Sequence, residues 1–133
     1  MDLQLAGRRA LVTGGSKGIG RATAEVLAEE GVDLLLVSRS ADVLSATADA
    51  IRGKFQVQVE TLAADLSREE EVLRVAVAAG EVDILVNNAG AIPPGDLLRV
   101  DNETWRRAWD LKVFGYINMT REVLRGMLAR RSG

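Results

Sequence analysis

Short apolar runs alternate along the chain with longer segments in which apolar residues recur at helical spacing. The runs predict four strands, at residues 10–13, 33–38, 56–63 and 83–87. The first, second and fourth runs are almost continuously apolar, which is typical of strands with both faces covered. The pattern therefore predicts a sheet that lies between layers of helices.

The segments between the strands predict three helices, at residues 18–30, 41–54 and 68–79. Gly31 and Gly80 directly follow the first and third of them, where glycine often ends a helix. Ser40 is the predicted N-cap of the second helix. Ser67 and Glu70 have the spacing of a capping box and predict the start of the third. Strands that alternate with helices indicate parallel pairing through right-handed crossovers.

A fourth, longer helix is predicted after a loop at residues 90–100 that is rich in proline and glycine. Asp101 or Asn102 is expected to cap it, and it extends to about residue 129. The helical spacing gives it one apolar stripe, formed by Trp105, Trp109, Val113, Ile117, Leu124 and Leu128.

A glycine-rich loop at residues 14–20 joins the first strand to the first helix. Because glycine has no side chain and adopts positive φ readily, the turn can be tight and its backbone can approach a ligand. The N–H groups and the positive dipole end of the helix then favour an anion. The spacing Gly-x-x-x-Gly-x-Gly differs from both Gly-x-Gly-x-x-Gly and the Walker-type phosphate loop. The strand before it and the helix after it nevertheless predict a site for the pyrophosphate of a dinucleotide.

The predicted fold class is α/β, with one domain over residues 1–133 and a Rossmann-type doubly wound parallel sheet in strand order 3-2-1-4. A complete sheet of this type has two halves, and the chain supplies four strands and the long helix. Its fourth strand would be an apolar edge, which proteins usually avoid. We therefore expect that the C-terminal half of the domain is missing from this sequence. A naturally short chain that pairs this edge with another chain is the alternative.

Composition narrows the classes of function. The 133 residues carry a net charge of −2 and give a pI of about 5.2, so no basic field favours nucleic acid or an anionic membrane. Cys and His are both absent, which argues against disulfides and thiolate metal sites and removes the commonest general base. The start of the sequence has no secretory pattern, and no apolar run is long enough to span a bilayer. We expect a cytoplasmic domain without metal, nucleic-acid or membrane partners.

Three motifs resemble those of the short-chain dehydrogenase/reductase family. They are Thr13-Gly14-x-x-x-Gly18-x-Gly20, Asp65-Leu66 and Asn87-Asn88-Ala89-Gly90. Each follows the expected strand, their order is that of the family, and together they are specific. The resemblance covers the whole chain and implies the cofactor-binding portion of an oxidoreductase.

The resemblance also implies a set of nucleotide-binding residues. In the glycine loop they are Gly14, Ser16, Lys17, Gly18, Ile19 and Gly20. Residues 16–19 would line the pyrophosphate and ribose, and Gly20 would let the first helix pack closely on the sheet.

The other two motifs receive roles from the same resemblance. Asp65 would accept a hydrogen bond from the adenine amino group, with Leu66 packed nearby. Asn87 would tie the fourth strand to the first. Ala89 and Gly90 would let the nicotinamide-side ribose approach.

The end of the second strand, Ser38 and Arg39, bears on the choice of cofactor. An acid there would hold the ribose 2′-OH of NAD, whereas an arginine suits the 2′-phosphate of NADP. The chain has no acid at these positions, and Lys17 adds a second positive charge. Ser38 can donate to a phosphate, and Arg39 can bind it in a bidentate manner. The sequence predicts NADP(H) rather than NAD(H); the alternative is that Lys17 and Arg39 are solvated surface charges.

The catalytic Ser, Tyr and Lys of the family have no counterparts in the sequence. The family places its Lys four residues after the Tyr, but the one tyrosine, Tyr116, is followed at that spacing by Thr120. The catalytic set is therefore expected beyond Gly133. Lys112 stands where the long helix of the family has an Asn that helps to hold a water. It would alter the proton relay or pair with an unidentified acid, unless the motif is misread by one residue.

The sequence thus predicts an NADP(H)-dependent oxidoreductase of the short-chain type, which transfers hydride between nicotinamide and an alcohol or carbonyl substrate. This activity is expected of the intact protein, and the 133-residue chain itself is expected to be inactive. The family packs its long helix between subunits, which implies a homo-oligomer. A non-catalytic dinucleotide-binding or interaction module is the alternative. The spacing of the glycine loop argues against a sugar-nucleotide epimerase.

Overall fold

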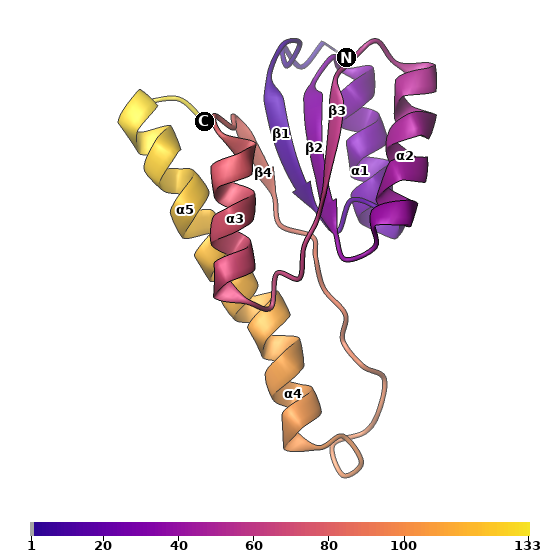
Figure 1. Ribbon diagram of the computed structural model, residues 1–133, viewed down its shortest axis with the longest axis vertical. Coiled ribbons are helices and arrows are strands. Elements are labelled where there is room, and N and C mark those ends of the chain that lie inside the picture. The colour runs from indigo at the N-terminus through magenta and orange to yellow at the C-terminus, as the bar shows by residue number, and fades with distance from the viewer. Residues whose placement is uncertain (1) are drawn as a thin grey trace.

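Four parallel strands form a single sheet in the computed structural model, which describes residues 2–133. The strands are β1 (Arg9–Thr13), β2 (Asp33–Ser38), β3 (Val59–Ala63) and β4 (Ile84–Val86). Their order, β3-β2-β1-β4, confirms the predicted topology. β4 pairs with β1 alone and is an edge, as expected, although β3 and β4 are both shorter than the predicted runs. All four strands point the same way, so their carboxyl ends share one edge of the sheet (Figure 1).

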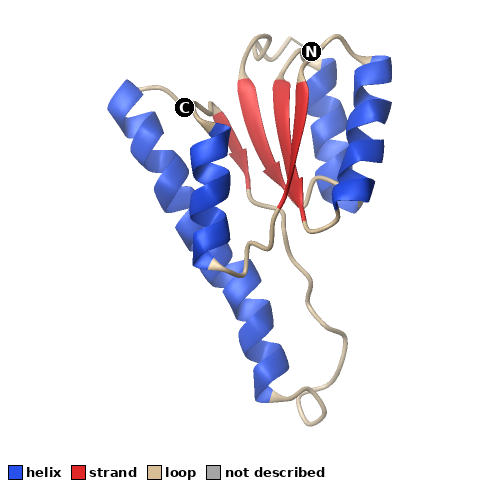
Figure 2. Cartoon of the chain, in the orientation of Figure 1, coloured by secondary structure: helices blue, strands red, loops and turns tan. Residues whose placement is uncertain are grey.

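Helices cover both faces of this sheet (Figure 2). One face carries α1 (Gly18–Glu29) and α2 (Ala41–Lys54), and the other carries α3 (Glu69–Ala79) and α5 (Gly115–Arg130). This arrangement is the doubly wound architecture that the alternation of elements predicts.

The predicted long helix is divided into three parts. α4 (Asn102–Trp109) leads into a π-helical segment, η1 (Asp110–Phe114), and then into α5. A long connection brings the chain from β4 to α4, which projects beyond the carboxyl ends of the strands (Figure 1). Gly115, at the start of α5, leaves no room for a side chain, because an added Cβ would lie 2.7 Å from the carbonyl oxygen of Leu66. The start of α5 therefore lies directly against the connection between β3 and α3.

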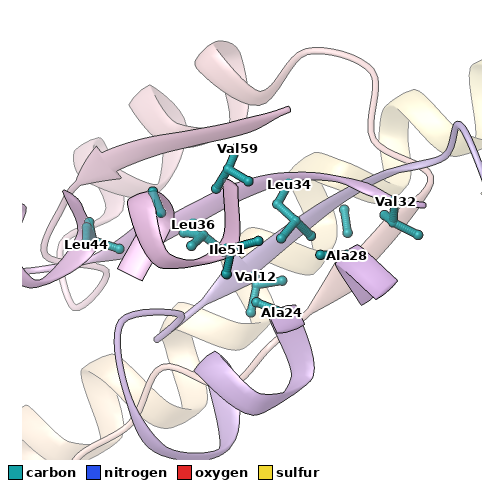
Figure 3. Packing of buried hydrophobic residues seen from close by; sticks show 11 residues of the cluster. Val12, Ala24, Ala28, Val32, Leu34, Leu36, Leu44, Ile51 and Val59 are labelled. Atoms are coloured by element: carbon teal, nitrogen blue, oxygen red, sulfur yellow. The ribbon is translucent and has the colours of Figure 1, made fainter. Parts of the chain in front are cut away.

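The core under α1 and α2 is built from alternate residues of the strands (Figure 3). Val12, Leu34 and Leu36 point to this side and are fully or almost fully buried. Ala24 of α1 and Ile51 of α2 are both completely buried, because the two helices pack closely on the sheet. Burying a side chain the size of Leu stabilises the fold by about 1.5–3 kcal/mol, so these positions anchor the layer.

The opposite core uses the intervening strand residues. Leu11 and Leu35 are register partners in β1 and β2, and both face α3 and α5. Val72 and Val75 of α3 and Met119 of α5 close over them. Successive residues of one strand thus enter different cores, which explains why β1 and β2 are continuously apolar.

The predicted apolar stripe of the long helix lies mainly on the outside of the molecule. Most of its members are exposed, namely Trp105, Trp109, Ile117, Leu124 and Leu128. The face that α5 turns toward the core instead carries Met119 and Val123. The helix therefore has two apolar faces, one of which has no cover within residues 2–133.

Two of the predicted helix starts are confirmed by side-chain caps. Ser40 accepts the N–H of Val43 at 3.5 Å at the start of α2. Asp101 accepts the N–H of Thr104 at 2.8 Å at the start of α4.

The predicted capping box at Ser67 and Glu70 is wrong. Arg68 occupies the N-cap of α3 and makes no side-chain cap hydrogen bond. The Ser67 hydroxyl donates instead to Asp65 at 2.7 Å, as part of a tight turn that precedes the helix. A local acceptor two residues upstream therefore competes successfully for the serine that the spacing assigns to the cap.

Candidate functional site

A cleft of about 490 Å³ opens at the carboxyl edge of the sheet. It is lined by residues 14, 16–19, 37–40, 43, 64, 66, 88–91, 111 and 112. These positions lie at or just after the ends of all four strands, in the first turns of α1 and α2, or in η1, so they come from distant parts of the sequence. The predicted nucleotide-binding residues line this cleft except for Gly20, Asp65 and Asn87.

The glycine loop turns sharply at the end of β1. Gly14 has a φ of +66°, and its N–H donates to the carbonyl of Val37 at 2.7 Å, which holds the loop against the end of β2. A Cβ at Gly14 would lie 2.8 Å from Nδ2 of Asn88 and 3.0 Å from Cα of Ala89. The position requires glycine for both its backbone angle and its contacts.

The start of α1 faces the cleft without a side-chain cap. Lys17 occupies its N-cap in an extended conformation and makes no cap hydrogen bond through its side chain. Gly20 lies behind this turn, where an added Cβ would collide with the carbonyl of Gly14 and the amide of Asn88. This is the close-packing role that the resemblance implies for Gly20, and it explains why Gly20 does not line the cleft. The uncapped amides and the positive end of the helix dipole suit an anion.

The end of β4 is tied to β1 by Thr13 and Asn88. The Thr13 hydroxyl accepts the N–H groups of Asn88 and Ala89 at 3.0 and 3.1 Å, and the Asn88 amide donates to the carbonyl of Gly14 at 3.2 Å. The resemblance implies that Asn87 connects β4 to β1, but the structure shows that the neighbouring residue, Asn88, makes these contacts. Asn87 points to the α5 side, where its amide donates to Thr120 at 2.9 Å. Side chains alternate between the two sides of an extended segment, so adjacent asparagines face different neighbours.

Ser38, at the end of β2, has an unsatisfied hydrogen-bonding group. Its hydroxyl oxygen is buried and has no hydrogen-bond partner. A buried polar atom of this kind is uncommon, and its partner would be a ligand or an ordered water. Arg39 and Lys17 line the same cleft, both are exposed, and neither has a carboxylate within 4 Å among residues 2–133. The lining contains no acidic residue, so this end of the cleft is positively charged.

The end of β3 contributes Ala64 and Leu66 to the cleft, and Leu66 is almost completely buried. Asp65 does not line it. One of its carboxylate oxygens accepts from both the N–H and the hydroxyl of Ser67, at 3.1 and 2.7 Å. The carboxylate thus stabilises the turn before α3, and the adenine contact implied for Asp65 stays a prediction.

Lys112 reaches the cleft from the middle of η1, on the β4 side. Its side chain lies beside Gly90, since a Cβ built there would be 3.2 Å from both Cδ and Nζ of Lys112. Nζ also lies 5.8 Å from the centre of the Tyr116 ring. No acid lies within 4 Å of Lys112 in the part of the chain that is described, so these residues do not supply the acid that one of the alternatives for Lys112 requires. π-helical turns frequently occur at functional sites.

Thr47 supports the site and is not among the predicted residues. Its hydroxyl donates to the carbonyl of Ser16 at 2.8 Å, and the side chain is buried. The signal in the sequence is a polar residue on the inward stripe of α2, which also carries Leu44, Ala48 and Ile51. A polar residue at such a position needs a buried partner, here the backbone of the glycine loop.

The fold and the anion-binding cleft define a dinucleotide-binding α/β protein. Residues 8–133 match the family model described as short chain dehydrogenase, and the chain belongs to this family. The L-xylulose reductase of Mesocricetus auratus is 38% identical over 130 residues, which are 98% of this chain and 51% of that protein. The chain spans about half the length of the curated relatives it matches.

Solved structures agree with this assignment. One is the L-sorbose reductase from Gluconobacter frateurii, complexed with NADPH and L-sorbose, which superposes with a TM-score of 0.93 and is 37% identical in sequence. The match covers 98% of this chain and 51% of the L-sorbose reductase chain. A short-chain dehydrogenase from Sphingobium yanoikuyae, in complex with NADPH, has a TM-score of 0.89 and 32% identity, with coverage of 95% and 50%.

Among residues 2–133, none of the helices has the length and hydrophobicity of a membrane span, and no three Asp or Glu side chains come together as a metal site would require.

Proposed function

We propose that residues 1–133 form the nucleotide-binding part of an NADP(H)-dependent oxidoreductase. The observation that carries the proposal is the buried, unpartnered hydroxyl of Ser38. It lies in a cleft with Lys17 and Arg39, and neither cation has a carboxylate within 4 Å among residues 2–133. A phosphate on the ribose would accept from Ser38 and from the guanidinium of Arg39. The similar proteins that were solved with NADPH support the same choice over NAD(H).

The pyrophosphate would lie at the uncapped start of α1. Gly14 and Gly18 keep the backbone there free of side chains, and the amides of the first turn are available as donors. Thr13 and Asn88 hold the ends of β1 and β4 together, and they thereby fix the width of the cleft. Residues Ala89 and Gly90 extend the surface toward β4, where the second ribose would fit.

The activity proposed for the whole protein is hydride transfer between nicotinamide and an alcohol or carbonyl substrate. The bound cofactor supplies the hydride, and a general acid supplies or removes the proton on oxygen. Residues 1–133 have no Tyr followed by Lys at the family spacing, so we place this acid outside them and propose that they bind nucleotide without turnover.

Sugar-like carbonyl compounds are one substrate class to examine, since similar proteins are named for xylulose and sorbose.

Association with a second copy of the chain is part of the proposal. Trp105, Trp109 and Ile117 form an exposed apolar face on α4 and α5. A face of this kind favours burial against another protein surface. We propose that the intact protein is a homo-oligomer, and that it acts in the cytoplasm.

Calorimetric titration with NADPH tests the nucleotide site, and a carbonyl reduction assay of the whole protein tests the activity. Saturable binding of NADPH together with turnover supports the full proposal. Binding without turnover across a broad panel of carbonyl and alcohol substrates would instead favour a non-catalytic nucleotide-binding module. Absence of binding by folded protein contradicts the proposal.

A further inference from the structure

Lys112 occupies the end of the cleft that the phosphate-binding residues do not reach. The strand order places the end of β2, with Arg39, on one side of β1 and the end of β4, with Gly90, on the other. Lys112 lies over Gly90, so its charge stands at the β4 side. The cleft thus carries Arg39 at the β2 side and Lys112 at the β4 side, with Lys17 at the start of α1 after β1.

A dinucleotide that spans this cleft has two chemically different ends. If its ribose phosphate binds Ser38 and Arg39, as proposed above, the pyrophosphate crosses β1 and the second nucleoside reaches Gly90. That second nucleoside carries the nicotinamide ring. Lys112 then stands beside this half of the nucleotide, because its side chain lies next to Gly90.

The two redox states of the nicotinamide ring differ in charge. The ring is positive in the oxidised cofactor and neutral in the reduced one, while the phosphates are the same in both. An ammonium group near the ring therefore repels one state and not the other, whereas a cation that contacts only phosphate treats both alike. A group that distinguishes two ligands must do so through such a difference in interaction.

We infer that Lys112 makes the site select the reduced cofactor, NADPH, over NADP⁺. The inference rests on the proposed function and extends it to the redox state of the cofactor that the site binds more tightly. Lys112 has no carboxylate within 4 Å among residues 2–133 that would neutralise its charge. The Coulomb repulsion between two unit charges about 7 Å apart weakens binding roughly three-fold if the effective dielectric constant is that of water. It weakens binding about fifty-fold if the effective dielectric constant is 20.

The test is to measure the dissociation constants of NADP⁺ and NADPH separately by calorimetry, for the wild-type chain and three variants. Lys112→Met removes the charge and keeps the length of the side chain, whereas Lys112→Arg keeps the charge. Lys54→Met removes a lysine at the exposed end of α2 and is the matched control. The expected result is that the ratio of the NADP⁺ to the NADPH dissociation constant falls on the order of tenfold in Lys112→Met. The ratio should stay near the wild-type value in the other two variants.

Raising the salt concentration provides a second measurement on the wild-type chain alone. The preference for NADPH should shrink as the charge of Lys112 is screened. A ratio that is unchanged in Lys112→Met, with both nucleotides still bound, overturns this inference and leaves the proposed function intact. A folded wild-type chain that binds neither nucleotide overturns both.

Discussion

The hydroxyl of Thr13 accepts the N–H of Asn88 at 3.0 Å and thereby joins the last residue of β1 to the first turn after β4. The same oxygen accepts the N–H of Ala89 at 3.1 Å and donates to the carbonyl of Val86 at 3.3 Å. Because Thr13 is almost completely buried, water cannot replace these partners. One side chain therefore sets the spacing of two strand ends that line the cleft.

Replacing Thr13 by Val keeps the shape of the side chain and removes these hydrogen bonds. Leaving the buried N–H groups without an acceptor should lower the free energy of unfolding by about 1–3 kcal/mol. Urea denaturation measures the change. Thr23→Val is the control, since the Thr23 hydroxyl only bonds the carbonyl one turn back in α1, and a change there should be much smaller. Equal losses in the two variants would contradict the proposed role of Thr13.

Gly20→Ala tests the close contact between α1 and the glycine loop. The added methyl group collides with the carbonyl of Gly14 and the amide of Asn88, so the helix must move away from the loop. Overpacking of this kind should destabilise the protein by about 1–3 kcal/mol and weaken nucleotide binding.

Gly53→Ala is the matched control, because a methyl group added at Gly53, in the last turn of α2, meets nothing within 4 Å. Replacing a helical glycine should raise stability by up to about 0.5–1 kcal/mol. Thermal unfolding of both variants separates the two outcomes. Destabilisation by Gly53→Ala, or none by Gly20→Ala, would argue against the packing described.

Arg39→Asp should weaken NADPH binding much more than NADH binding. Hydrogen bonds to charged groups contribute about 1.5–3 kcal/mol, which corresponds to roughly tenfold to more than a hundredfold in affinity. The introduced carboxylate can also accept from the ribose 2′-OH, as acids at this position do. Arg121→Asp, on the exposed surface of α5, makes the same charge change away from the cleft and should leave both affinities unaltered. A parallel loss for NADPH and NADH would contradict a role in phosphate recognition.

The start of α4 should be sensitive to acid. Hydrogen bonding from Thr104 lowers the pKa of Asp101 below its usual value. A carboxyl whose pKa is depressed on folding stabilises the folded state above its unfolded pKa, and this contribution is lost as the pH falls through the lower folded pKa. Hydrogen exchange of the amides in α4 should therefore accelerate, relative to other helices, below about pH 4.

Asp101→Asn retains a side-chain oxygen that can cap the helix but cannot titrate. The acid sensitivity of α4 should disappear in this variant while exchange at neutral pH changes little. Persistence of the acid effect in Asp101→Asn would assign it to another group.

The topology and most of the site follow from the sequence because they depend on local signals. The continuous apolar runs of β1 and β2 are a direct consequence of two covered faces, and Gly14, Gly18 and Gly20 mark the turn where backbone must approach backbone. The N-caps at Ser40 and Asp101 likewise depend on residues within three positions.

The wrong predictions concern positions where more than one local hydrogen-bonding arrangement is compatible with the sequence. Asn87 and Asn88 are chemically identical, and only the direction of the chain after β4 decides which of them faces β1. Ser67 could cap α3 or bond Asp65, and the geometry of the turn decides for the second. The contact between Thr47 and Ser16 joins residues far apart in the chain, so it depends on how α2 lies over the glycine loop. Such choices depend on tertiary packing that a local pattern does not contain.

The most direct test of the account is the ratio of the NADH to the NADPH dissociation constant for the wild-type chain. Ser38, Lys17 and Arg39 together predict that NADPH binds at least tenfold more tightly than NADH. Equal affinities, or tighter binding of NADH, would contradict the assignment of a phosphate to the end of β2.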